Sequence, residues 1–328
     1  MPQHRHVLVV GERWREAERD GPPSNFIHNI VGSLEALDGY AVSALFTDET
    51  YLAGESVDQA LVDRVAEDPP DLIFLTLLPE YPINPSPVAL DLVKIKRGVP
   101  LAAMYWDTAL PKQVEFADGY SDIVDVNVAI DCYTVYPAVS RAPEKWLPLW
   151  TPQDPRIFFA DARARDIDVA FVGSVDTYPD RRDALAYLEA NGVSVCKHGG
   201  IREGGLTIDG YADLLRRTRI SLNFSKLFGR YGNHQFKGRV LESMLCGALV
   251  LEPNNRQTPR WFRAGVEYDT FGSSDELLEK IARYRDDEAA RAAIADRGRR
   301  KAAETLSAKT FWDAIFDRLA ENRPSALL

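Results

Sequence analysis

The chain has 328 residues, enough for about two domains of ordinary size. Its apolar content of 45% and charged content of 27% are typical of a globular protein. The net charge is −10, from 39 basic and 49 acidic residues, so a nucleic-acid backbone is not an expected partner. Any anion must therefore bind at a local cluster of basic residues.

Cysteine content and hydropathy bear on the compartment. Cys132, Cys196 and Cys246 are far apart and lie among apolar residues, which favours buried reduced thiols over disulfides. The N-terminus runs directly into the apolar residues 7–10, so we expect no signal peptide. No apolar run approaches the ~20 residues of a membrane-spanning helix. We therefore predict a cytoplasmic protein without a membrane span, and its oligomeric state stays open.

Short apolar strands alternate with amphipathic helices in the first half of the chain. This alternation predicts a parallel sheet with helices on both faces. The expected strands are 6–10, 41–46, 71–77, 100–106, 123–130 and 145–149, and the expected helices are 26–37, 57–66 and 88–96.

The proline-containing segment 151–155 predicts a hinge, after which the alternation restarts. Two doubly wound domains joined by a hinge would face a cleft at the carboxyl ends of their strands, where ligands of such sheets bind. No strand is predicted in the C-terminal tail. The expected strands are 167–172, 193–196, 220–224 and 248–251, and the expected helices are 181–191, 211–217, 275–284, 288–304 and 309–322, besides a short helix ending at Gly247.

Residues 234–252 are the most informative stretch, because they predict a polar loop, that short helix and a buried strand. The helix would carry Arg239 and Glu242 one turn apart on one face. Free N–H groups at its N-terminus form an anion site, and a carboxylate further along can accept two sugar hydroxyls. This order of groups fits a nucleoside diphosphate. The segment before the helix adds glycines and basic residues, namely Gly229, Arg230, Gly232, His234 and Lys237.

Several segments resemble glycosyltransferases of the GT-B fold, most closely the spore-maturation CgeB-like group. Residues 168–174, followed by Arg181-Arg182, resemble the entry into that group's nucleotide-binding domain. Residues 237–247 resemble its central R-x-x-E-x-x-x-x-G signature. The resemblance covers most of residues 165–320, including the segments 262–267 and 273–277. In the first half only Trp106-Asp107 and Leu147-Pro148 are similar.

The resemblance implies an α/β protein with two Rossmann-like, doubly wound domains. Residues 1–153 would form the acceptor-side domain, residues 154–308 the nucleotide-sugar-binding domain, and residues 309–328 a helix that returns to the first domain. The implied activity moves a sugar from a nucleoside-diphosphate sugar, here predicted to be a UDP-sugar, to an acceptor hydroxyl. The acceptor would be a glycan, a protein or a small molecule, and no metal or other cofactor is implied.

One position departs from related retaining enzymes. They carry a glutamate eight positions before the ribose-binding glutamate, and His234 stands there in this chain. The choice between retention and inversion of configuration therefore stays open.

Seven residues are expected to bind the donor nucleotide. The Glu242 carboxylate would accept two hydrogen bonds from the ribose hydroxyls, and Arg239 would neutralise the diphosphate as the nucleotide departs. A glycine at the end of a strand lets the backbone approach a ligand, and an adjacent serine can donate to phosphate. The alternatives are a surface glutamate, a solvated basic face and ordinary loop residues. The seven are Gly173, Ser174, Arg182, Lys226, Lys237, Arg239 and Glu242.

Two residues are candidates for catalysis. Asp107 follows a predicted strand and would serve as general base in an inverting reaction, with Glu12 and His28 as competitors. Its alternative role is a helix cap or turn. His234 would contact the transferred sugar or the diphosphate, or it is a surface histidine. The five histidines show no spacing to carboxylates or cysteines that is typical of a metal site.

Two other functions compete with glycosyl transfer. A nucleotide-sugar epimerase on the same fold would need more acids and histidines in the first domain than the sequence offers. A non-catalytic sugar or nucleotide binder of the periplasmic kind would normally carry an export signal. A transferase that has lost its catalytic groups is a further alternative, because His234 departs from the related pattern.

Overall fold

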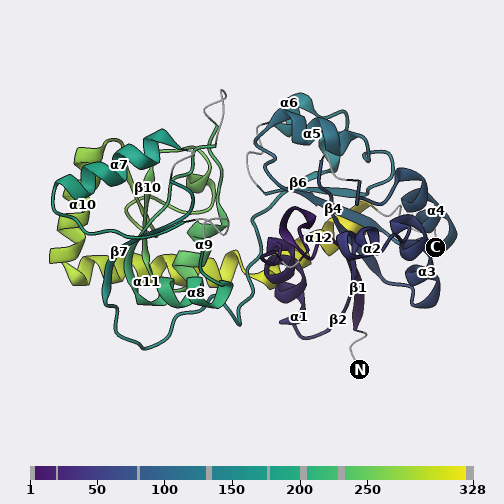
Figure 1. The fold of residues 1–328 in the computed structure, drawn as a ribbon, viewed down its shortest axis with the longest axis horizontal. Helices are drawn as coiled ribbons and strands as arrows, with labels where there is room; N and C mark the ends of the chain where they lie inside the picture. The colour runs from purple at the N-terminus through teal and green to yellow at the C-terminus, as the bar shows by residue number, and fades with distance from the viewer. Residues whose placement is uncertain are drawn as a thin grey trace. The chain divides into compact units, whose positions relative to one another are not determined.

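The computed structural model describes residues 4–19, 21–79, 82–130, 135–175, 178–199, 205–227 and 233–322. The chain divides into two compact units (Figure 1). Unit 1 comprises Met1–Asp154 with Ala308–Leu328, and unit 2 comprises Pro155–Ser307. Cys132, Gly229, Arg230 and Gly232 lie outside the described residues, whereas Cys196 and Cys246 are free thiols.

Unit 1 contains a six-stranded sheet in the order β2-β1-β3-β4-β5-β6, and every pairing is parallel. Its central strands β3 and β4 are buried at every position, which explains their continuous apolar runs. The strands are β1 (Arg5–Gly11), β2 (Tyr40–Phe46), β3 (Leu72–Thr76), β4 (Leu101–Tyr105), β5 (Val126–Ala129) and β6 (Trp146–Pro148).

Helices cover both faces of this sheet. Ile73 and Leu75 of β3 pack into a core shared with α3 and α4, whereas Phe74, between them, points to the opposite face. There it meets Trp312 of α12 (Ala308–Asn322), with the ring centroids 4.8 Å apart. The C-terminal helix therefore packs on the first unit. The other helices are α1 (Ser33–Glu35), α2 (Thr47–Leu52), α3 (Val57–Glu67), α4 (Pro87–Arg97), α5 (Pro111–Asp118) and α6 (Tyr136–Val139).

Unit 2 contains a five-stranded parallel sheet in the order β11-β10-β9-β7-β8. The chain crosses the sheet between β8 and β9 and then adds strands on the other side of β7, so the fold is doubly wound. The strands are β7 (Ile167–Val172), β8 (Cys196–His198), β9 (Thr218–Leu222), β10 (Leu249–Pro253) and β11 (Asp269–Phe271).

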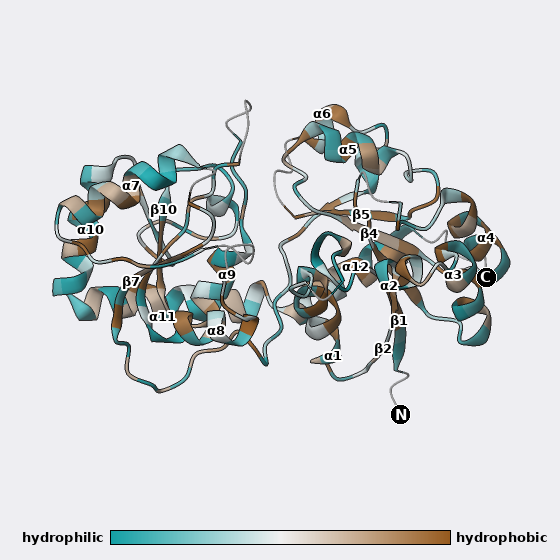
Figure 2. Cartoon of the chain, in the orientation of Figure 1, coloured by the Kyte–Doolittle hydropathy of each residue, from teal (hydrophilic) through white to brown (hydrophobic). Residues whose placement is uncertain are grey.

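Alternate residues of β7 show how helices cover this sheet. Val169 and Phe171 share a core with α7 (Pro179–Ala190) and α10 (Ser274–Asp286). Ala170 shares a second core with α8 and α9 on the other face. Figure 2 shows the apolar residues gathered along the strands of both units. The remaining helices are α8 (Ile208–Arg217), α9 (Gly238–Leu245) and α11 (Glu288–Thr305).

The sequence analysis did not predict the helices α2, α5 and α6, and three further elements differ from its expectations. The first predicted helix is a π-helix over Ile27–Gly32 that continues into α1. The strand predicted at 193–196 starts only at Cys196, because the chain first turns at Gly192. A strand that the sequence did not predict, β11, follows β10 at the edge of the sheet. The three residues of β11 carry too little alternation to mark a strand on their own.

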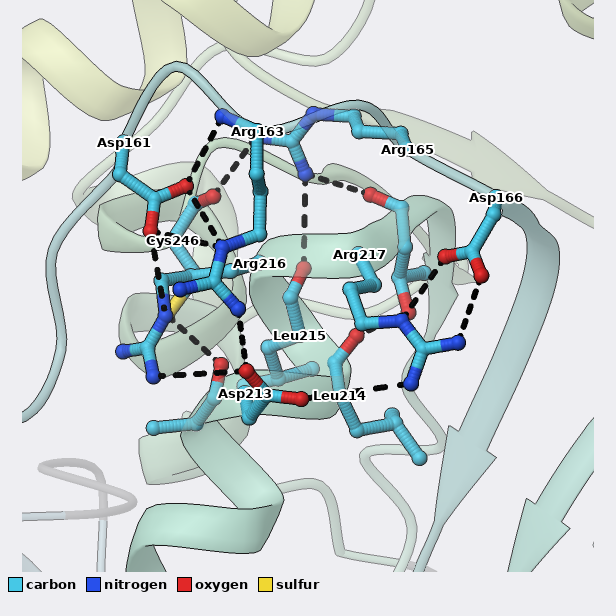
Figure 3. A network of polar contacts seen from close by, with 12 residues as sticks. Asp161, Arg163, Arg165, Asp166, Asp213, Leu214, Leu215, Arg216, Arg217 and Cys246 are labelled. Carbon is cyan, nitrogen blue, oxygen red and sulfur yellow. Dashed lines mark hydrogen bonds and ion pairs between the residues drawn. The ribbon is translucent and has the colours of Figure 1, made fainter.

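A polar network holds the loop before β7 against α8 and α9 (Figure 3). Arg165 donates to the carbonyl oxygens of Thr218 (2.6 Å) and Cys246 (2.8 Å), so its charge lies at the C-terminus of α9, where the helix dipole favours it. Arg217 pairs with Asp166 at 2.6 Å. These contacts lie at the amino ends of β7 and β9, opposite to the carboxyl edge of the sheet. The Arg165 contact holds the C-terminus of α9 in place.

Along the described ranges, no helix is long and apolar enough to cross a membrane.

Candidate active site

A pocket of about 680 Å³ opens at the carboxyl edge of the sheet in unit 2. Pro253 of β10, Phe271 of β11 and Phe224, just beyond β9, contribute to its wall, together with the first turns of α7 and α10. This is the edge at which ligands of parallel α/β sheets bind. Its wall also contains three basic side chains, those of Arg181, Lys226 and His234.

Gly173 and Arg239 meet at the end of β7. Gly173 has a φ of +146°, and its N–H donates to the carbonyl oxygen of His198 at 2.9 Å. A Cβ atom at this position would lie 2.7 Å from an Nη atom of Arg239. The backbone conformation therefore favours glycine, and its lack of a Cβ lets the guanidinium take this position. The sequence prediction linked the two residues only through a shared ligand, and the structure places them in contact.

Arg239 is held by a buried polar relay. Its Nη1 donates to Oδ1 of Asn223 at 3.1 Å, and the amide of Asn223 donates to Glu252 at 2.7 Å. Both Asn223 and Glu252 are fully buried. The Arg239 guanidinium also lies 5.3 Å from the centroid of the Phe171 ring, while its Nε has no hydrogen-bond partner.

Arg181, in the first turn of α7, is only 4% exposed. It donates to the carbonyl oxygens of Ser174 and Phe224 and lies 4.0 Å from the Tyr178 ring centroid. Burial, together with the nearby charge of Arg239, lowers the pKa of Arg181 to about 10. It remains a cation at neutral pH.

Arg181 and Arg239 lie close enough for their charges to interact, and Glu242 is an acid whose charge interacts with that of Arg239. Arg181 and Arg239 both lie 5.3 Å from the Phe171 ring centroid, and neither forms an ion pair within the described ranges of the chain. A buried charge without a partner is costly, so functional sites are where such arrangements persist. The pair is suited to bind a multiply charged anion.

Arg182, which the sequence prediction chose over its neighbour, points away from the pocket. It is 56% exposed and pairs with Asp183 at 3.1 Å. The helical pattern contains the signal that separates the two arginines. Arg181, not Arg182, is three, four and seven positions before the buried residues Ala184, Leu185 and Leu188, so it shares their face.

Glu242 lies one turn after Arg239 on α9 and keeps part of its surface exposed. Its Oε2 accepts a hydrogen bond of 2.6 Å from the hydroxyl of Tyr211, a residue that sequence reasoning did not single out. Burial raises the pKa of Glu242, although the Tyr211 hydrogen bond and the charge of Arg239 oppose that rise. The predicted helix face is therefore present, and its carboxylate is not a solvated surface group.

Lys226 and His234 lie on adjacent extended segments joined by a β-bridge. Lys226 pairs with Asp180 at the rim of the pocket. Nδ1 of His234 is 2.8 Å from the hydroxyl of the buried Ser225. Burial and the charge of Lys226 lower the pKa of His234, so its imidazole is neutral at neutral pH.

Lys237 and Ser174 flank these groups. Lys237 is the N-cap of α9, and its ammonium donates to the side chain of Gln235 at 2.7 Å. Ser174 follows Gly173 and accepts from Arg181 through its carbonyl oxygen. Their expected contacts with a nucleotide remain predictions.

Asp107 belongs to unit 1 and follows β4 at the carboxyl edge of that sheet. It adopts a left-handed conformation with a φ of +54°, and its carbonyl oxygen accepts from the N–H of Leu110 at 2.8 Å. Asp107 therefore forms part of a turn, as its alternative role predicted. A non-glycine residue held in this region stores strain, which is frequent at functional sites. Its role as a general base stays a prediction.

The competitors of Asp107 are more enclosed. Glu12 is 8% exposed. Its Oε1 accepts a 2.6 Å hydrogen bond from the hydroxyl of Ser24, and its Oε2 has no hydrogen-bond partner within the described residues. Burial raises the pKa of Glu12 and lowers that of His28, the latter to about 4. His28 is therefore a neutral imidazole at physiological pH.

No group of three or more His, Cys, Asp or Glu side chains is arranged to hold a metal ion within the part of the chain that the structure describes.

Solved structures of other proteins share this fold. The chain superimposes on HepE from Anabaena, solved with UDP and glucose, with a TM-score of 0.63 and 14% identity over 97% of this chain and all of that one. It is similar to sucrose-phosphate synthase from Thermosynechococcus elongatus, with a TM-score of 0.60 and 10% identity over 97% and 100% of the two chains. These likenesses confirm the GT-B fold predicted from the sequence.

An alpha-glucosyltransferase solved with UDP-glucose and DNA has a TM-score of 0.61 and 10% identity over 96% of this chain and 99% of its own. Residues 153–317, half of the chain, match the glycosyl transferase-like family. The chain therefore belongs to this family and is a glycosyltransferase. No curated protein sequence matches it.

Adjacent arginines offer a matched test of the anion site. Inorganic pyrophosphate is expected to raise the thermal unfolding midpoint of the wild-type protein and of Arg182→Met, but to raise that of Arg181→Met far less. A ligand at 100 times its Kd adds about 2.7 kcal/mol of stability. Differential scanning fluorimetry measures the three midpoints. Equal pyrophosphate responses in the two variants would contradict a binding role for Arg181.

Proposed function

We propose that unit 2 binds a UDP-sugar and that the enzyme transfers the sugar to an acceptor hydroxyl without a resident metal. The observation that carries this proposal is the pair of cations, Arg181 and Arg239, that form no direct ion pair within the described residues and lie beside Gly173, with Glu242 one turn further along α9. This arrangement would bind the diphosphate at the two arginines and the ribose at Glu242, which matches the order of these groups in a nucleoside diphosphate.

The proposed role of the arginines is electrostatic. Breaking the bond between the sugar and the phosphate leaves negative charge on the departing UDP. Arg239 and Arg181 would stabilise that charge, aided by the N–H groups at the start of α9. Since both cations are already enclosed and oriented by Phe171, Asn223 and backbone carbonyls, little reorganisation is needed when the charge develops.

His234 and Lys226 would contact the transferred sugar or the phosphate attached to it. Both line the pocket, and Lys226 is the N-terminal member of their bridge. A neutral imidazole at His234 can exchange hydrogen bonds with sugar hydroxyls but cannot replace the charge of the glutamate found at this position in related retaining enzymes.

The choice of uridine is supported by the relatives. HepE was solved with UDP and the alpha-glucosyltransferase with UDP-glucose. The finer assignment to the CgeB-like group is supported by the segment 237–247 and by Gly173-Ser174 followed by two arginines. A cytoplasmic location and the classes of acceptor remain predictions from the sequence.

The family match favours transfer over the epimerase alternative. A transferase that has lost its activity would bind the nucleotide without turning it over. The stereochemical course remains a separate question. In an inverting reaction Asp107 would accept the acceptor proton, whereas in a retaining reaction the donor phosphate itself can do so.

Glu242→Gln is expected to weaken UDP binding by about 1–3 kcal/mol, because the charge-assisted hydrogen bonds to ribose become neutral ones. Isothermal titration calorimetry with UDP measures this loss. Glu279→Gln, a change of the same kind on the exposed side of α10, serves as the control and is expected to bind like the wild type. Wild-type affinity in Glu242→Gln would overturn the ribose assignment.

Removal of divalent metal is expected to leave donor binding unchanged, since Arg181 and Arg239 supply the positive charge. UDP-glucose is titrated calorimetrically after treatment with excess EDTA and again after addition of Mn²⁺. The two Kd values should agree. An affinity that collapses in EDTA and returns with Mn²⁺ would contradict metal independence.

A further inference from the structure

The hydroxyl of Tyr211 and the carboxylate of Glu242 form a pair linking α8 to α9. The Oη–Oε2 distance is 2.6 Å, which lies within the usual range of a hydroxyl–carboxylate hydrogen bond. Burial raises the pKa of Tyr211 well above its usual value, so the phenol stays protonated and can only donate to this carboxylate. The direction of the hydrogen bond is therefore fixed.

Tyr211 is itself held firmly. Its backbone N–H donates to the carbonyl of Thr207 at 2.8 Å in the first turn of α8. Its ring packs against Phe158, with the centroids 6.0 Å apart and the planes nearly perpendicular. A phenol with a fixed ring and a fixed donor direction can orient the group that accepts from it.

The other carboxylate oxygen of Glu242, Oε1, differs from Oε2 in its hydrogen bonding. Oε1 accepts no hydrogen bond from any residue in the described ranges, whereas Oε2 is engaged by Tyr211. Glu242 also retains some exposed surface. The carboxylate thus has one oxygen committed to the protein and one available to a ligand.

We propose that Tyr211 is a positioning residue that orients the Glu242 carboxylate and leaves Oε1 as the acceptor for a ribose hydroxyl of the donor. This inference rests on the proposed function, because it assigns a support to the residue proposed to bind ribose. It assigns no contact between Tyr211 and the substrate.

Tyr211 also keeps Glu242 ionised in a site whose burial opposes ionisation. The hydrogen bond and Arg239 lower a pKa that burial raises. Without the hydroxyl the pKa of Glu242 rises further. Because the ionised carboxylate is the stronger acceptor, donor affinity falls as pH falls through this pKa. In Tyr211→Phe that fall begins at a higher pH than in the wild type.

The test measures UDP-glucose binding by calorimetry from about pH 5 to about pH 8, a range in which its diester diphosphate does not titrate. Tyr211→Phe keeps the ring that packs on Phe158 and removes only the hydroxyl. We expect an affinity about three- to tenfold weaker at neutral pH, with a larger loss at low pH. In a Glu242→Gln background, adding Tyr211→Phe should cause little further loss, because the hydroxyl acts through the carboxylate.

Tyr187→Phe is the matched control, since Tyr187 donates to Asp275 in an exposed pair between α7 and α10. It should bind UDP-glucose like the wild type at every pH. Melting curves establish that each variant is folded. If Tyr211→Phe keeps the wild-type affinity and pH profile while Glu242→Gln loses affinity, the role of Tyr211 is overturned and the donor site stands. If the wild type itself binds no UDP-glucose, the proposed function fails.

Discussion

The contact between the Arg239 guanidinium and the Cα of Gly173 is the constraint on which the site depends. A side chain at residue 173 would displace the Arg239 guanidinium from this position, and the φ of +146° is itself a glycine conformation. This close approach brings a cation on α9 to the end of β7, where Arg181 already lies beneath the Tyr178 ring. Neither arginine forms a direct ion pair within the described residues, so both guanidinium groups can receive an anion.

The surroundings hold this charge pair in place. Glu252 accepts a hydrogen bond from Asn223, which in turn accepts one from Arg239 near the N-terminus of α9. At the other end of α9, Arg165 donates to the carbonyl oxygen of Cys246. Gly298 of α11 packs against α9, because a Cβ there would lie 3.6 Å from Cγ of Met244. The helix with the predicted donor-binding residues is thus fixed at both ends and from the α11 side.

Much of this arrangement was readable from the sequence. The alternation of buried strands and helices predicted both sheets, and the spacing of Arg239 and Glu242 predicted a shared helix face. Arg181 and Arg182 both fit the motif, and only the phase of the buried face on α7 shows that Arg181 rather than Arg182 lines the pocket. Tyr211 and Asn223 were not predicted, because each contacts a residue far along the chain, Glu242 and Arg239 respectively. Such long-range pairs leave no local pattern.

The central claim is that Arg181 and Arg239 receive the diphosphate of a nucleotide sugar. A crystal structure of the protein with UDP-glucose tests this most directly. The account predicts diphosphate oxygens within hydrogen-bond distance of both guanidinium groups and a ribose hydroxyl on Oε1 of Glu242. A nucleotide whose diphosphate contacts neither arginine, or one bound away from the carboxyl edge of the unit 2 sheet, would contradict it.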